Sequence, residues 1–83
     1  MKMENRIAIV GIFIYDADAV DEVNRLLHEY SRYIMGRMGL PYREKKVSVI
    51  SIIIDAPGDV TGALSGKLGM LQNVQVKAVY AKA

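Results

Sequence analysis

Two segments of this sequence, residues 6–15 and 47–55, carry apolar side chains on both faces of an extended strand. Successive side chains of a strand point to opposite faces of its sheet, so such segments belong at the centre of a sheet with both faces covered. Only two amphipathic helices are available to cover it, one at about 19–31 and one running from 56 to Gly69. Two helices cover one face of a small sheet, and the other face is left apolar.

The remaining patterns complete the order βαββαβ. Apolar residues recur every three or four positions after Asp18, a good N-cap, so the first helix should begin there. The second helix is expected to open at 56–59, because proline is well tolerated in a first turn. This order predicts one α+β domain over residues 1–83 with a ferredoxin-like βαββαβ fold, in which two helices lie on one face of a four-stranded antiparallel sheet. The expected strands are 6–15, 33–38, 47–55 and 74–80, with a turn-rich connection at 39–46.

The uncovered sheet face predicts a homo-oligomer, either a dimer or a tetramer. Monomers rarely expose contiguous apolar patches larger than a few hundred Å². The alternative is that the 39–46 connection folds over this face. The patch should consist of every second residue of the first strand, together with the residues of 47–54 that lie on the same face of the sheet. The two candidate sets are Ile7, Ile9 and Phe13, or Val10, Ile12 and Ile14.

Three glycines in the second helix predict a further contact surface. Gly62, Gly66 and Gly69 lie on one stripe, opposite the apolar face of the helix. Each interior glycine costs roughly 0.5–1 kcal/mol relative to alanine. The stripe therefore suggests close approach of another backbone or a ligand, and a poorly optimised surface helix is the alternative.

The basic residues are concentrated around the connection between the second and third strands. Five basic residues stand against one acid, Glu44, between positions 32 and 46. This excess points either to contact with an anion or to a solvated hairpin. The basic residues are Arg32, Arg37, Arg43, Lys45 and Lys46.

The residues of an enzyme or a metal centre are lacking. The chain has no cysteine and one histidine, His28, which sits at the margin of the first helix's apolar face. One histidine without cysteines cannot build a transition-metal site within one chain. No Ser/His/Asp set or phosphate-binding glycine loop is present, so we expect neither catalysis nor a cofactor. Residues 1–5 lack the apolar stretch of a signal peptide and no apolar run spans a membrane, so the expected location is the cytoplasm.

Two motifs support a family resemblance. They are the run YIMGRMGLPYR at residues 33–43, and DAP at 55–57 followed by LSGKLGML at 64–71. Both resemble the family of regulators of the iron-only hydrogenase system. That family is similar to the C-terminal regulatory domain of the nickel-responsive repressor and, more loosely, to ACT domains. The resemblance implies an ACT-like fold, oligomeric assembly and ligand-dependent regulation. This sequence departs from the repressor, because we expect neither the repressor's DNA-binding domain nor its histidine and cysteine metal ligands here.

The sequence therefore predicts an oligomeric regulatory module that binds a small-molecule effector or a protein partner at a subunit interface. One alternative is a nucleic-acid-binding regulator that uses the basic 37–46 hairpin, and another is a purely structural subunit. The residues expected at the ligand or interface site are Gly36, Arg37, Tyr42, Arg43, Gly62, Gly66 and His28.

Overall fold

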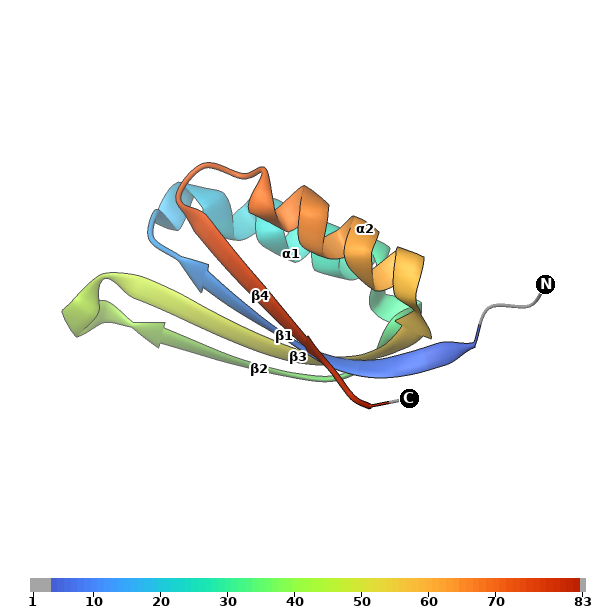
Figure 1. Cartoon of the computed structure of the whole chain (residues 1–83). Coiled ribbons are helices and arrows are strands. Elements are labelled where there is room, and N and C mark those ends of the chain that lie inside the picture. The colour runs from blue at the N-terminus through green and yellow to red at the C-terminus, as the bar shows by residue number, and fades with distance from the viewer. Residues whose placement is uncertain (1–3, 83) are drawn as a thin grey trace.

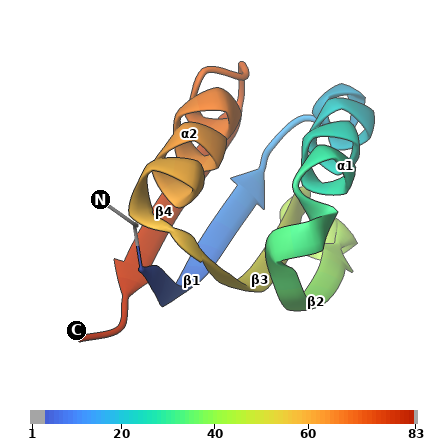
Figure 2. The ribbon, with the colours of Figure 1, turned by 90° about the vertical axis from the view of Figure 1, so that its right-hand side faces the viewer.

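The computed structural model describes residues 4–82 and has the predicted ferredoxin-like order of elements (Figure 1). The sheet has the order β2-β3-β1-β4, and each neighbouring pair is antiparallel. Both helices lie on the same face of this sheet, α1 over the β2 side and α2 over the β4 side (Figure 2). The elements are β1 (Asn5–Ile14), α1 (Val20–Glu29), β2 (Ile34–Tyr42), β3 (Val47–Pro57), α2 (Gly58–Gly69) and β4 (Val74–Tyr80).

The core lies between the helices and the two central strands. β1 and β3 pair continuously from Asn5 opposite Pro57 to Ile14 opposite Ser48. One parity of each strand is buried under the helices, as the alternation of strand side chains requires. The buried strand residues are Ala8, Val10, Ile12, Ile14, Ile50, Ile52, Ile54 and Ala56.

Each helix contributes one apolar stripe to this core. α1 buries Val23, Leu26 and Leu27, and α2 buries Leu64 and Leu68. The predicted end of the second helix at Gly69 is confirmed.

The start of the first helix differs from the prediction. Asp18 does not cap α1, whose N-cap is Ala19 without a side-chain hydrogen bond. A short 3-10 turn, Ala17–Ala19, precedes the helix, and the Asp16 carboxylate accepts a hydrogen bond from the Asp18 backbone N–H at 3.0 Å. The capping carboxylate therefore stands two residues earlier than predicted, because the chain enters the helix through this extra turn.

The second strand is longer than predicted, and the expected 39–46 connection is correspondingly wrong. β2 continues to Tyr42, with Leu40 opposite Val49 and Tyr42 opposite Val47. Only a 3-10 turn, Arg43–Lys45, and Lys46 join it to β3. Pairing with β3 overrides the weak strand propensity of Gly39 and Pro41, and a proline is tolerated because β2 is an edge strand.

No helix in the described part of the chain is long and apolar enough to cross a membrane. Of the N-terminal segment considered above, residues 1–3 lie outside the described residues, as does residue 83.

Candidate functional site

The face of the sheet opposite the helices is apolar and solvent-exposed. We call it the open face. Ile9 is 51% exposed and Ile53, directly opposite it on β3, is 46% exposed. Val79 on β4, which pairs with Ile9 on its other side, is 63% exposed. Cross-strand partners share a face of the sheet, so these side chains form a row across three strands.

The apolar surface extends along the sheet on both sides of this row. Ile7 and Phe13 continue it along β1, and these residues belong to the first of the two predicted sets. On β2, Met38 is 72% exposed and Leu40 is also exposed. The open face therefore runs over all four strands, and its prediction from the parity of β1 and β3 is confirmed.

The alternative in which residues 39–46 cover this face is wrong. Residues 39–42 remain paired with β3 in the plane of the sheet. The β2–β3 hairpin reaches beyond the end of β1 instead of folding over the sheet (Figure 1).

A groove lies on the other side of the sheet, between α1 and the β2–β3 hairpin. We call it the hairpin groove, and it consists of three adjoining cavities of about 350, 270 and 310 Å³. The first and second cavities share Pro41 and Ser48, and the second and third share Arg37. The shared lining residues show that the three cavities adjoin one another along the α1 side of β2.

Arg37 lies at the middle of the hairpin groove. Its Nη2 donates a hydrogen bond to the Asn24 Oδ1 atom of α1 at 2.8 Å. This bond joins the two walls of the groove and holds the guanidinium between them.

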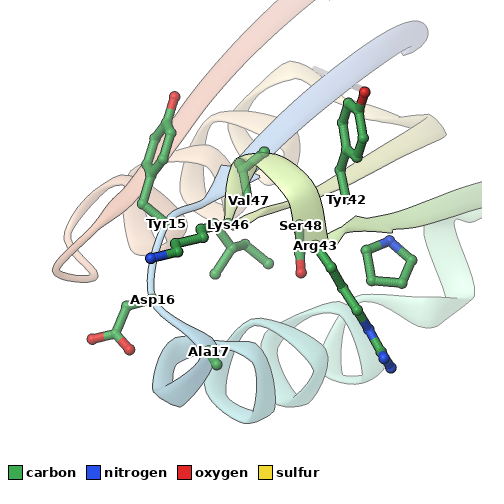
Figure 3. Close-up of a pocket in the computed structure, with 10 residues that line it drawn as sticks. Tyr15, Asp16, Ala17, Tyr42, Arg43, Lys46, Val47 and Ser48 are labelled. Carbon is green, nitrogen blue, oxygen red and sulfur yellow. The ribbon is translucent and has the colours of Figure 1, made fainter.

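Two more basic residues, Arg43 and Lys46, line the end of the groove at the hairpin turn. Figure 3 shows Arg43 and Ser48 directed toward the α1 side, and Tyr15 and Tyr42 directed toward the opposite side of the sheet. Tyr15 is held there by its hydroxyl, which donates to Gln75 Oε1 at 3.0 Å. This end of the groove therefore adjoins the open face.

One carboxylate, Asp16, lies beside these cations. It accepts hydrogen bonds from the Asp18 backbone N–H and, at 3.5 Å, from Asn73 Nδ2. In Figure 3 the carboxylate points away from Arg43 and Ser48. Asp16 therefore organises the start of α1 and leaves Arg43 uncompensated.

The structure brings five of the seven predicted site residues to the hairpin groove. Arg43 lies at its turn end, and His28, Gly36 and Arg37 lie at its other end and middle. Tyr42 also lines the turn end, but its ring points toward the opposite side of the sheet (Figure 3). Gly62 and Gly66 are not among the lining residues, and they lie exposed on α2. A Cβ atom at either glycine would meet nothing within 4 Å, so packing within the described chain does not require them.

Sequence reasoning missed the groove residues Asn24 and Ser48, whereas Gly39 lies within the segment 36–43 that the sequence favours as a site lining. Gly39 and Ser48 are small residues within strands, and a glycine in a strand interior often marks close approach of a ligand or backbone. That signal was present in the sequence. The position of Asn24 depends on how α1 packs over β2.

Nothing in residues 4–82 groups three histidine, cysteine or acidic side chains in a way that could hold a metal ion. The groove therefore offers cations, hydroxyls and amides as binding groups.

Comparison with protein families matches residues 6–78 to the family described as "TM1266-like: Iron-only hydrogenase system regulator, putative". No curated protein matches the chain. Two distant solved structures share the fold alone. A formyltetrahydrofolate deformylase from Pseudomonas putida KT2440 has 14% identity and a TM-score of 0.64 over 88% of this chain and 28% of its own. The divalent ion tolerance protein CutA1 from Ehrlichia chaffeensis has 12% identity and a TM-score of 0.50 over 99% and 86% of the two chains.

A much closer match is the structure of the uncharacterized protein TM1266 from Thermotoga maritima. The two chains are 40% identical, with a TM-score of 0.91 over 95% of this chain and 100% of that one. The family match spans nearly all the described elements, from β1 into β4. The chain therefore belongs to the TM1266-like family, which is described as a family of regulators of the iron-only hydrogenase system.

Proposed function

We propose that residues 1–83 form one non-enzymatic regulatory module of the cytoplasm that assembles with further copies of itself through the open face. A small molecule or protein partner bound beside that interface then changes the state of the assembly, as in the ACT-like regulatory domains that the sequence resembles. The observation that supports this proposal best is the apolar row across β3, β1 and β4. The family description supports the regulatory role.

The energetics favour a covered open face. Burying one large aliphatic side chain is worth roughly 1.5–3 kcal/mol. Ile9, Ile53 and Val79 are each about half exposed, and Ile7 and Met38 add to the same surface. Several such side chains together offset an association cost of 4–15 kcal/mol, an order-of-magnitude range.

A second copy suits this face because its strands carry one charged residue of each sign. Lys77 on β4 pairs with Gly11, and Asp55 on β3 pairs with Ile7, so both charged residues share the open face with the apolar row. A two-fold axis places the same surface on both sides of an interface. Each subunit then offers a cation and an anion to its partner.

The test is the mass of the freshly purified protein in native mass spectrometry, compared with that of the Ile53→Asp variant. We expect the wild type to be a dimer or tetramer and the variant to be a folded monomer, because a buried aspartate would lack a partner. Met70→Asp is the matched control, since Met70 is 87% exposed and lies at the end of α2, away from the sheet. A monomeric wild type at micromolar concentration would refute assembly.

A further inference from the structure

We propose that the hairpin groove binds a small anion, a metabolite carrying a phosphate or carboxylate group, attracted by the positive charge of Arg37, Arg43 and Lys46. This inference rests on the proposed regulatory function and names the chemical class of its effector. The groove lies on the α1 side of the sheet and adjoins the open face only at its turn end, so the proposed assembly leaves most of it accessible.

The first support is the charge of the lining. Three basic side chains line the groove, and the two ion pairs found among residues 4–82 involve none of them. Arg37 is held in place through a neutral partner, Asn24, which leaves its positive charge uncompensated. Arginine donors in a fixed geometry suit phosphate and carboxylate groups.

The second support is the shape of the groove. Gly39, Pro41 and Ser48 line its middle, where strands more often carry large side chains. A Cβ atom at Gly39 would meet only Ile50 Cγ1, at 4.0 Å. Space for a larger side chain is therefore available, and the small residues keep it open. Each cavity is near the lower end of the roughly 300–1,000 Å³ typical of small-molecule sites.

The third support distinguishes a small anion from a nucleic acid. Asp18, Asp21 and Glu22 precede or begin α1 and do not line the groove cavities. A long polyanion that extended beyond the groove along α1 would approach these carboxylates, and like charges repel. A small anion confined to the groove would avoid most of this repulsion.

The experiment is a titration of the full chain with inorganic phosphate, pyrophosphate and citrate, followed by amide chemical shifts in NMR at low ionic strength. Shifts confined to the groove residues support the proposal, and the comparison of pyrophosphate with citrate distinguishes a phosphate from a carboxylate ligand. Saturable binding of none of the three at millimolar concentrations would overturn it.

Matched variants separate a shaped site from diffuse attraction. Arg43→Gln and Lys46→Gln should each weaken the best probe about tenfold, the effect of losing one charge-assisted hydrogen bond. Lys45→Gln removes the same charge from the same hairpin turn, but Lys45 does not line the groove cavities. It should change affinity less than about twofold, since only screened attraction at a distance is lost. Equal losses in Lys45→Gln and Lys46→Gln would overturn the proposal.

Gly39→Val tests the shape. The added side chain should fill the groove and abolish binding, while valine favours the strand and preserves thermal stability. A variant that folds and still binds the probe with wild-type affinity would overturn the proposal. Preferential binding of a single-stranded DNA 12-mer, with Lys45 contributing as much as Lys46, would also overturn it in favour of a nucleic-acid surface.

The same samples should be weighed by native mass spectrometry. A monomer that binds the anion in the groove would refute the proposed assembly and retain this site. An oligomer that binds none of the probes would refute the site and retain the assembly.

Discussion

The Arg37 side chain of β2 donates a hydrogen bond to the Asn24 side chain of α1 at 2.8 Å, across the middle of the hairpin groove. No carboxylate is involved in this bond, so the guanidinium is oriented without being neutralised. The pair thus fixes the position of a cation and leaves its charge available to a ligand.

Replacing Asn24 with aspartate should keep the geometry and remove the free charge. In Asn24→Asp the new carboxylate pairs with Arg37, and an exposed ion pair of this kind changes the stability of the fold by about 0–1 kcal/mol. Anion binding in the NMR titration should weaken at least about tenfold. Asn24→Ala is the control. It frees the Arg37 side chain but leaves its charge unpaired, so anion binding should weaken less than in Asn24→Asp. Unchanged binding in Asn24→Asp would show that Arg37 does not contact the anion.

Replacing Thr61 with valine should stabilise the protein. Thr61 is fully buried on α2, and its Oγ1 atom has no hydrogen-bond partner among residues 4–82. An unsatisfied buried hydroxyl costs about 1–3 kcal/mol, and valine has a similar shape without it. Chemical denaturation should show a gain of about 1 kcal/mol, whereas Thr61→Ser, which keeps the hydroxyl and loses a methyl, should show a loss. A destabilised Thr61→Val variant would mean that the hydroxyl has a partner in the assembled protein.

Replacing Gly66 with leucine should separate folding from assembly. A side chain at this position meets nothing within 4 Å, and leucine favours a helix by roughly 0.5–1 kcal/mol over glycine. Folding should therefore be retained, whereas a further subunit or ligand contact through the glycine stripe, separate from the open face and the hairpin groove, should be disrupted. Analytical ultracentrifugation of Gly66→Ala and Gly66→Leu provides the comparison. If both variants assemble and bind like the wild type, the stripe has no role in contact.

The pKa of Glu22 should depend on Arg25. Two hydrogen bonds from Arg25 to the Glu22 carboxylate, at 3.0 and 2.6 Å, lower this pKa below the ordinary glutamate value. A lowered pKa in the folded state stabilises the protein above the unfolded-state pKa, and this contribution is lost as the pH falls through the folded-state pKa. Arg25→Gln should raise the Glu22 pKa toward its ordinary value in a carboxyl NMR titration. Arg32→Gln should leave the Glu22 pKa unchanged. A Glu22 pKa that is also unchanged in Arg25→Gln would contradict the hydrogen-bonded pair.

The sequence was sufficient to predict the open face because its signal is local. Alternation along β1 puts Ile7 and Ile9 on one parity and Val10 and Ile12 on the other, and two helices cover one face. Which parity faces the helices depends on the packing of the sheet, so both sets remained open until the structure distinguished them. The core face of α2 was predictable for the same reason, from the spacing of Leu64 and Leu68.

The hairpin groove could be predicted only in part, because it depends on contacts distant in sequence. Composition and resemblance predict Tyr42 and Arg43 as site residues, but the sequence pattern predicts a turn-rich connection beyond Met38. Gly39 and Pro41 disfavour a strand in isolation, and their pairing with β3 is a tertiary effect. Asn24 carries no pattern of its own and becomes a groove residue only when α1 packs beside Arg37.

β2 contributes none of the buried residues, although it provides one wall of the groove and part of the open face. The hydrophobic core that stabilises the fold therefore places few demands on the amino acids of this strand. Substitutions there can change what is bound without the loss of stability that a core substitution brings. If the groove binds an effector as we propose, its specificity can change by substitutions in one edge strand while the folding core stays the same.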